Sequence, residues 1–167
     1  RAVACTGKPV IMSTGMGTLS EIAESVHVLE ENGCRQFALL KCTSAYPAPS
    51  EEANLARIKH MEEAFNVPTG LSDHTMGNTV SAIAVSLGAC IIEKHFTKSR
   101  AVEGPDSLFS LEPDELRDLV EAVRVAEKAV GRVTYELTEK EHNSRVFRRS
   151  LFAVKNIKAG ELLNSTN

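Results

Sequence analysis

Short apolar runs alternate with longer segments in which apolar residues recur every three or four positions through most of the chain. The short runs are typical of buried strands, and the longer segments are typical of helices that pack one face against a sheet. The pattern predicts four strands, over residues 8–12, 36–40, 69–72 and 90–93. It predicts a helix after each strand, the first opening near residue 19 and the others spanning about residues 55–65, 79–87 and 113–130.

The predicted helices carry start and stop signals. Asn32 and Gly33 close the first helix, and Gly88 is a suitable left-handed cap after the third. Pro113 and the two acidic residues after it suit the first turn of the last helix, and Gly131 suits the position beyond its end.

Strand–helix–strand units place consecutive strands parallel to one another. Four such units in succession predict an α/β fold that corresponds to half of a TIM-type (β/α)₈ barrel. A closed barrel of this type typically contains about 250 residues, whereas the chain has 167. We therefore expect residues 1–131 to form half of a barrel domain and the chain to be a fragment.

The sequence changes character after residue 131. Residues 132–148 are largely polar and are predicted to form a linker. Over residues 149–167, an apolar run from Ser150 to Val154 and a turn ending at Gly160 predict the first strands of a small β module. A solvated tail is the alternative interpretation of this segment.

Composition narrows the possible functions. The chain is 43% hydrophobic and 25% charged with a net charge of −3, which is ordinary for a globular protein. It has no basic surplus, two tyrosines and no tryptophan, so nucleic acid is not an expected partner. No apolar run is long enough to span a membrane. The four cysteines are scattered, which favours reduced thiols in a cytoplasmic protein.

Two histidines follow neighbouring predicted strands. His74 comes after the strand over residues 69–72, and His95 comes after the strand over residues 90–93. Parallel strands end at the same edge of a sheet, and barrel proteins place their chemistry at this edge. With Asp73 and Glu93 beside them, the two imidazoles suggest a metal site. Two separate structural histidines, each satisfied by hydrogen bonds, are the alternative.

Several motifs in the same order resemble the sialic acid synthase (NeuB-like) family. The main ones are Lys41-Cys42-Thr43-Ser44-Ala45-Tyr46-Pro47, Gly70-Leu71-Ser72-Asp73-His74-Thr75 and Ile92-Glu93-Lys94-His95-Phe96. Ser13-Thr14-Gly15-Met16, Gly104-Pro105-Asp106 and Arg149-Ser150-Leu151-Phe152 match as well. The resemblance runs through nearly the whole chain.

The resemblance implies an enzyme that condenses phosphoenolpyruvate with an N-acetylated amino sugar to give a nine-carbon acidic sugar. It implies that residues 1–131 are the carboxy-terminal half of the TIM barrel, and that residues 149–167 begin an antifreeze-like (SAF) module that docks on the other subunit of a homodimer. The family's general acid/base glutamate and phosphate-binding lysines belong to the other half of the barrel. We therefore expect the chain to be inactive by itself.

The run Lys41 to Pro49, followed by Glu52-Ala53-Asn54-Leu55, most resembles the pseudaminic acid synthases, which use a diacetamido trideoxy sugar of the altropyranose type. An N-acetylneuraminate or legionaminate synthase is the first alternative. A half-barrel that has no catalytic role and associates with itself through its open edges is the second.

The resemblance also assigns the metal-site residues. His74 and His95 would be metal ligands and catalytic residues, with Mn²⁺ the expected ion and Mg²⁺ or Co²⁺ also compatible. Glu93 is a catalytic candidate that could orient a ligand or a water. An ion pair with Lys94 or Lys41 is its alternative role.

The remaining assigned residues would bind substrate. Hydroxyl groups at strand ends can donate to phosphate, although such serines are more often caps. By resemblance, Ser13 and Ser72 hold phosphoenolpyruvate, and Ser44 takes a place where an asparagine often stands. Tyr46 and Asp106 would line the sugar site, and Asp73 is included among the substrate-binding candidates.

Overall fold

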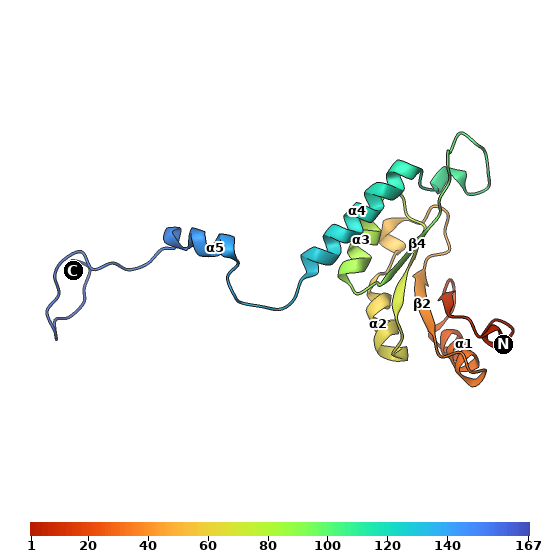
Figure 1. Ribbon diagram of the computed structural model, residues 1–167, viewed down its shortest axis with the longest axis horizontal. Coiled ribbons are helices and arrows are strands. Elements are labelled where there is room, and N and C mark those ends of the chain that lie inside the picture. The colour runs from red at the N-terminus through yellow and green to blue at the C-terminus, as the bar shows by residue number, and fades with distance from the viewer. The chain divides into compact units, whose positions relative to one another are not determined.

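The computed structural model describes residues 1–167 and contains two compact units, Arg1–Gly131 and Arg132–Asn167. The boundary between the units falls where the sequence places the end of the half-barrel. All four strands belong to the first unit, which is coloured from red to turquoise in Figure 1. The first unit therefore holds the sheet on which the candidate site depends.

The sheet contains β1 (Val10–Ser13), β2 (Phe37–Cys42), β3 (Thr69–Asp73) and β4 (Ile91–Lys94), in the order β1-β2-β3-β4. Every neighbouring pair is parallel. Sequential, all-parallel order with a helix in each connection is the arrangement of half a (β/α)₈ barrel. The predicted α/β class and half-barrel are confirmed.

The helices follow the predicted segments closely. The four that accompany the sheet are α1 (Leu19–Glu31), α2 (Ala56–Phe65), α3 (Thr79–Ser86) and α4 (Pro113–Val130). Short 3₁₀ turns occur at η1 (Ala4–Thr6), η2 (Ser50–Glu52) and η3 (Ser107–Phe109). A capping box at Thr18 and Glu21 starts α1, and a second one at Glu112 and Glu115 starts α4. These local bonds fix where α1 and α4 begin.

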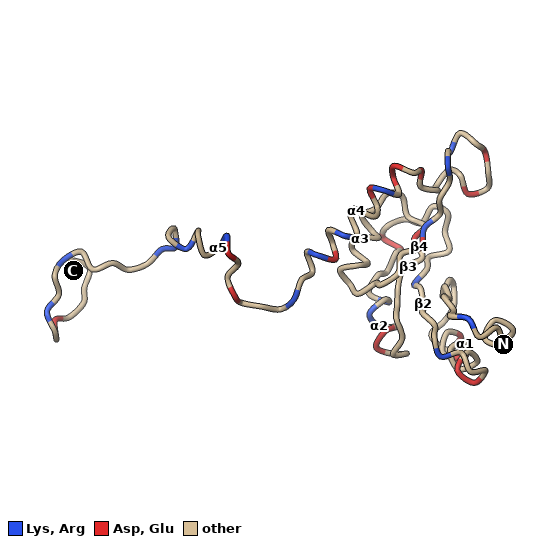
Figure 2. Tube along the Cα trace, in the orientation of Figure 1, with Lys and Arg blue, Asp and Glu red and all other residues tan.

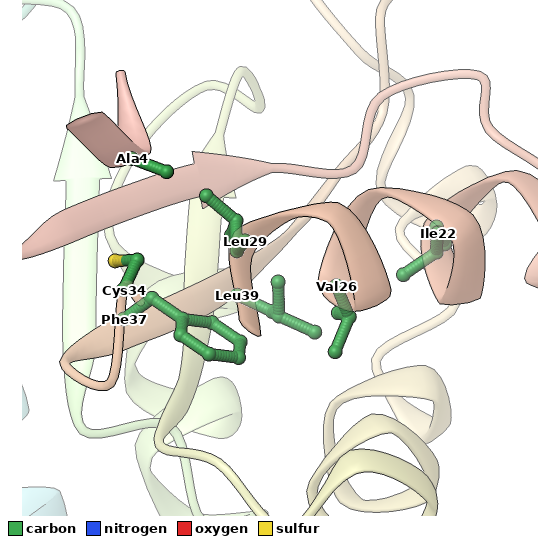
Figure 3. Packing of buried hydrophobic residues seen from close by; sticks show 7 residues of the cluster. All are labelled: Ala4, Ile22, Val26, Leu29, Cys34, Phe37 and Leu39. Atoms are coloured by element: carbon green, nitrogen blue, oxygen red, sulfur yellow. The ribbon is translucent and has the colours of Figure 1, made fainter. Parts of the chain in front are cut away.

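One face of the sheet is covered by helices, and we call it the helix-covered face. Figure 3 shows Ile22, Val26 and Leu29 of α1 packed with Phe37 and Leu39 of β2. A second cluster joins α2 and α3 to the later strands and includes Ile58, Val80, Ala84, Leu71 and Ile92. Successive side chains on a strand point to opposite faces. The strand residues that alternate with those in contact with the helices therefore lie on the other face.

The opposite face, which we call the inner face, carries Ile11, Leu40, Ser72 and Glu93. Gly70 leaves room for Leu40 there, because a Cβ at Gly70 would lie 2.7 Å from Leu40 Cδ2 and 2.3 Å from the Ile91 carbonyl oxygen. Leu40 is fully buried as a result. The inner face is therefore tightly packed on the two central strands, whereas Ile11 and Glu93 on the edge strands are exposed.

The first strand differs from the prediction. The sequence predicts a buried strand, but β1 alternates half-buried and exposed residues, and Ile11 is 58% exposed. β1 lies at an edge and pairs only with β2, so its inner side chains have one neighbouring strand rather than two. An apolar run alone does not distinguish an edge strand from a central one.

The second unit contains α5 (Glu139–Ser144) and the 3₁₀ turn η4 (Arg145–Phe147), and no strand. The strand predicted over Ser150 to Val154 is not formed, and Leu151, Phe152 and Val154 are exposed. A strand needs a neighbour for its backbone groups, and the bond from Val154 N to Asn167 O is the one long backbone link here. The linker and β-module assignments of residues 132–148 and 149–167 stay predictions.

Charged residues lie mainly on helices and loops, while the strands are mostly uncharged (Figure 2). Lys41 and Lys94 are the lysines within strands, and both side chains are buried. None of the helices combines the length and apolar character needed to cross a membrane.

Candidate functional site

The two predicted metal ligands lie side by side at the carboxyl ends of β3 and β4. The register pairs Ser72 with Glu93 and Asp73 with Lys94, and one histidine follows each strand directly. The ring centroids of His74 and His95 are 5.2 Å apart. The parallel pairing expected from the sequence thus brings the two imidazoles together.

A small cavity of about 190 Å³ opens at this position. Its lining is formed by Ser72, His74, Glu93, Lys94 and His95. The lining residues come from the ends of two adjacent strands, where barrel proteins gather their functional groups.

The hydrogen bond made by His74 fixes which of its nitrogens is free. Nδ1 of this buried imidazole lies 2.8 Å from the Thr43 carbonyl oxygen, which can only accept. In the neutral ring, Nδ1 therefore carries the proton and Nε2 keeps a lone pair. Histidines that ligate metals usually donate their other ring nitrogen to a carbonyl or a carboxylate in this way.

His95 makes no such hydrogen bond but lies near an acidic residue in the loop between β4 and α4. Its Nδ1 lies 3.6 Å from Oδ2 of Asp106. Phe109 packs edge-on against the same imidazole, with ring centroids 5.0 Å apart. Asp106 therefore lies beside a predicted metal ligand, in a position where its exposed carboxylate can also accept from a bound molecule.

Tyr46 forms an aromatic wall over both histidines. Its ring centroid lies 4.4 Å from that of His74 and 5.9 Å from that of His95. The side chain is about half exposed, so one side of the ring packs and the other faces solvent. This placement is consistent with the predicted role of Tyr46 in lining a sugar site.

Glu93 is held by a neighbouring strand rather than by a lysine. The Ser72 hydroxyl donates to Glu93 Oε1 at 2.7 Å. The ion pair considered for Glu93 is not formed, since Lys94 pairs with Asp73 and Lys41 donates to the Thr43 hydroxyl. Alternation along β4 explains this, because Glu93 and Lys94 point to opposite faces of the sheet.

Asp73 requires a correction. It was assigned to substrate binding, but its side chain is 1% exposed and lies on the helix-covered face. Its carboxylate accepts from Thr75 N, the Thr75 hydroxyl, the Ser81 hydroxyl and Lys94 Nζ, at 2.6–2.8 Å. All of these donors are internal, so Asp73 acts on the structure of the site and does not face a substrate.

The electrostatics of this side chain follow from the same contacts. Burial alone would raise the pKa of Asp73, but hydrogen bonds from Lys94, Ser81 and Thr75 outweigh burial and hold the pKa below its ordinary value. For Lys41 burial dominates, and it lowers the pKa together with the charge of Arg57. The two buried lysines thus differ in their partners. Lys94 pairs with the Asp73 carboxylate, whereas Lys41 donates to the Thr43 hydroxyl.

The remaining serines lie near the same edge of the sheet but outside the cavity. Ser13 ends β1 and is exposed. Ser44 follows β2, and its hydroxyl lies 3.8 Å from Cys42 Sγ. A Cβ at Gly15 would lie 3.4 Å from the Ser44 hydroxyl, so the loops after β1 and β2 touch.

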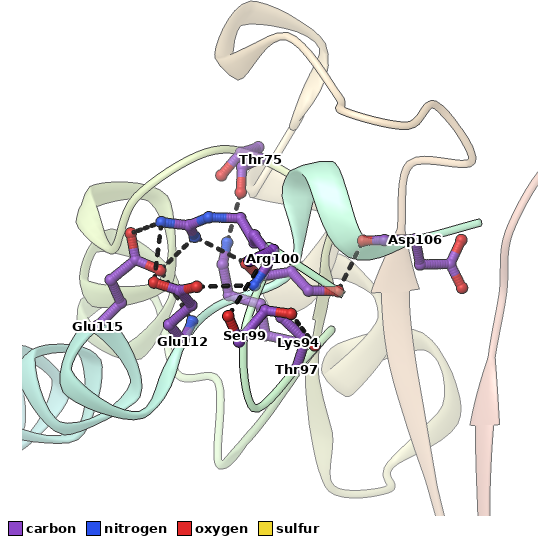
Figure 4. A network of polar contacts seen from close by, with 10 residues as sticks. Thr75, Lys94, Thr97, Ser99, Arg100, Asp106, Glu112 and Glu115 are labelled. Atoms are coloured by element: carbon purple, nitrogen blue, oxygen red, sulfur yellow. Dashed lines mark hydrogen bonds and ion pairs between the residues drawn. The ribbon is translucent and has the colours of Figure 1, made fainter. Parts of the chain in front are cut away.

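The loop that carries Asp106 is anchored by an arginine that the sequence reasoning missed (Figure 4). Arg100 donates to the Ser110 carbonyl and to Glu115, both at 2.9 Å, and its backbone N–H donates to Glu112 at 2.7 Å. Lys94 and Lys41 were considered only as partners of Glu93, and their burial within strands was not predicted. A charged residue inside an apolar strand was the available signal for both lysines.

The donor set at the cavity fits a divalent metal ion. The structure brings together no group of three or more His, Cys, Asp or Glu side chains that could hold a metal ion, so the candidate protein ligands are the two histidines. His74 and His95 would therefore supply two neutral nitrogen ligands, and water or substrate oxygens would complete the coordination. Imidazole with oxygen ligands suits Mn²⁺ and related borderline ions.

The parallel units and the polar groups that converge at the carboxyl ends of the strands define an α/β protein of the barrel class. The model of the NeuB family matches residues 1–135. The chain belongs to the NeuB family.

Its relatives include nonulosonic acid synthases. Over its full length, the chain is 45% identical to a pseudaminic acid synthase from Campylobacter jejuni. The match covers 49% of that protein. The chain is 43% identical, again over its full length, to 51% of an N,N'-diacetyllegionaminic acid synthase from the same species. The chain spans about half the length of these curated relatives.

A solved structure shows the same fold. The chain superposes on the N-acetylneuraminic acid synthetase of Leptospira borgpetersenii with a TM-score of 0.78 and 37% identity. The match covers 90% of this chain and 52% of that chain.

Proposed function

We propose that the chain is part of a nonulosonic acid synthase that condenses phosphoenolpyruvate with an N-acetylated amino sugar. The observation that carries the proposal is the pair His74 and His95, whose rings lie 5.2 Å apart beside a cavity in a NeuB-family chain. In this reading, the chain supplies the carboxy-terminal half of the barrel.

The reaction joins the methylene carbon of phosphoenolpyruvate to the aldehyde carbon of the sugar. The aldehyde oxygen becomes a hydroxyl, and water adds to the cationic carbon, which still bears the phosphate. Phosphate then leaves with cleavage of the carbon–oxygen bond, and a keto group remains. A divalent ion held by His74 and His95 would supply the polarisation of the aldehyde. Mn²⁺ is the ion we propose, with Mg²⁺ or Co²⁺ as alternatives.

The residues of this chain would orient the reactants. The Thr43 carbonyl holds His74 with Nε2 free, and Tyr46 offers an apolar surface to the sugar ring. Asp106 can accept from a sugar hydroxyl or an acetamido N–H. Glu93, held by Ser72, can orient a water at the mouth of the cavity. Ser13, Ser72 and Ser44 are proposed phosphoenolpyruvate contacts.

Pseudaminic acid is the product we propose, because the loop from Lys41 to Pro49 resembles pseudaminic acid synthases. Identity to a legionaminic acid synthase is nearly as high, so the legionaminic acid precursor is the alternative sugar. We further propose a cytoplasmic homodimer, which is compatible with four free cysteines.

A self-associating half-barrel is the second candidate. The exposed Ile11 on edge strand β1 favours pairing with another chain. Light scattering tests this candidate, since a strictly monomeric, well-folded chain would contradict it.

Phosphate release from phosphoenolpyruvate tests the catalytic proposal. The assay compares the 167-residue chain with a protein in which a complete barrel is restored, using Mn²⁺ and the pseudaminic, legionaminic and N-acetylmannosamine-type sugars in turn. We expect turnover in the restored protein, fastest with the pseudaminic acid precursor, and none in the chain alone.

Two histidine variants make this assay specific. His95→Ala should abolish turnover, whereas His27→Ala, on the exposed surface of α1, should leave it unchanged. Turnover that survives His95→Ala would contradict the assignment of this ligand. Release with none of the three sugars would contradict the substrate class.

A further inference from the structure

A buried ion pair joins the two residues that directly precede the histidines. Lys94 Nζ is 2.8 Å from Asp73 Oδ2, and their side chains are 3% and 1% exposed. Asp73 immediately precedes His74, and Lys94 immediately precedes His95. The pair therefore joins the last residues of β3 and β4 at the point from which both imidazoles project.

The contacts of the pair extend beyond one ion–ion distance. Lys94 Nζ also donates to the Thr75 carbonyl at 2.5 Å (Figure 4), and the Ser81 hydroxyl of α3 donates to Asp73 at 2.6 Å. Lys94 thus contacts the residues on both sides of His74. Buried charges are stable only when such hydrogen bonds compensate the loss of water.

A second link joins the same strand ends on the inner face. Ser72, which donates to Glu93 at 2.7 Å, is paired with it in the sheet register, just as Asp73 is paired with Lys94. The two strand ends are thus fastened on both faces of the sheet. His74 and His95 directly follow the residues that these contacts join.

We propose that Asp73 and Lys94 are positioning residues that set the spacing and orientation of His74 and His95. The two side chains are 3% and 1% exposed and bond to each other, so the pair acts through the two backbone segments that it joins. This inference rests on the proposed function, because it concerns the two proposed metal ligands. The geometry that it predicts can be measured without metal or substrate.

The pair could instead stabilise the fold without influencing the site. The two possibilities differ in what happens to the imidazoles when the pair is removed without loss of folding. The double variant Asp73→Asn/Lys94→Met removes both charges of the pair, so neither partner is left as a buried charge without its counterion. Ser81→Ala is a milder variant, because it removes one donor to Asp73 and keeps the ion pair.

The experiment is proton NMR of the metal-free chain, with the nuclear Overhauser effect between the ring protons of His74 and His95 as the readout. Val26→Ala is the matched control, because it weakens the core between α1 and the sheet and leaves the pair intact. We expect the ring–ring effect in the parent chain and in Val26→Ala, its loss in the double variant and its reduction in Ser81→Ala.

Addition of Mn²⁺ to the same samples gives a second readout. Broadening of the two imidazole signals should require about 10–100-fold more Mn²⁺ in the double variant than in the parent, as for other groups that orient metal ligands. A ring–ring effect that persists in the folded double variant, with an unchanged Mn²⁺ requirement, would overturn the positioning role. If the double variant does not fold, an unchanged effect in Ser81→Ala overturns it.

The outcomes also separate the two proposals. A parent chain that shows the ring–ring effect but no broadening by Mn²⁺ contradicts the metal site of the proposed function. The comparison of ring contacts then still decides the role of Asp73 and Lys94.

Discussion

The two faces of the sheet differ in burial and in the chemistry of their side chains, although the residues that form them alternate along the same strands. On the helix-covered face, apolar residues such as Ile58 and Leu71 are buried, and the charged pair Asp73 and Lys94 is fully enclosed by hydrogen bonds. On the inner face, Glu93 and Ile11 are exposed, and the cavity with the histidines opens. The comparison shows that residues adjacent in sequence can serve stability and chemistry separately, because a strand sends them to opposite sides.

The largest expected effect comes from removing one charge on the helix-covered face. Lys94→Met leaves the Asp73 carboxylate buried without its cation, so the free energy of unfolding should fall by about 3–5 kcal/mol. Urea unfolding followed by circular dichroism measures the change. Lys59→Met removes an exposed partner of Glu63 and should cost less than about 1 kcal/mol. Equal losses in the two variants would contradict the contrast between buried and surface charge.

Truncating an isoleucine on each face sharpens the comparison. Ile58 belongs to α2, packs against the helix-covered face and is 0% exposed. Ile58→Ala should therefore lower the free energy of unfolding by about 2–5 kcal/mol. Ile11, at 58% exposure on β1, should cost less than about 1 kcal/mol when changed to alanine. The same urea titration measures both. A large loss at Ile11 would show that the inner face is covered in solution, as self-association predicts.

Gly70→Ala tests the one tightly packed point of the inner face. The added methyl group would lie 2.3 Å from the Ile91 carbonyl oxygen, and we expect a loss of about 1–3 kcal/mol in thermal or urea unfolding. Gly104→Ala is the control, because its methyl group would meet only the Ser107 hydroxyl, at 3.0 Å. A neutral effect at Gly70 would mean that β3 and β4 can move apart easily.

The smallest expected effect is a pH dependence from Lys41. Its folded-state pKa is lowered, chiefly by burial, so the unfolded chain binds its proton more readily. Stability should therefore rise as pH increases through the lowered pKa towards the unfolded value of about 10.4. Urea unfolding at neutral and alkaline pH measures the rise, and Lys41→Met should reduce it. An identical pH profile in that variant would contradict a destabilising buried charge.

Much of the fold could be predicted because its signals are local. Start and stop signals such as Pro113 and Gly33 mark helix ends, and apolar spacing identifies the segments that pack on a sheet. Burial was less predictable, since the apolar run of β1 looks the same whether one or two strands flank it. The run from Ser150 to Val154 failed as a strand for a related reason, because a strand depends on partners elsewhere in space.

The candidate site divides in the same way. Parallel strand order was enough to place His74 beside His95. The partners of Asp73, Glu93 and Lys94 were not predicted, although strand alternation alone already argued against a shared face for Glu93 and Lys94.

The sequence by itself determined the order of strands and helices, the parallel sheet and the edge at which the two histidines meet. These follow from short-range periodicity and from the handed, parallel connection of successive units. The tertiary structure alone decided that Ser72 links to Glu93 and Asp73 to Lys94. Such pairings depend on the register between β3 and β4, and register is set by packing across the sheet rather than by either strand alone.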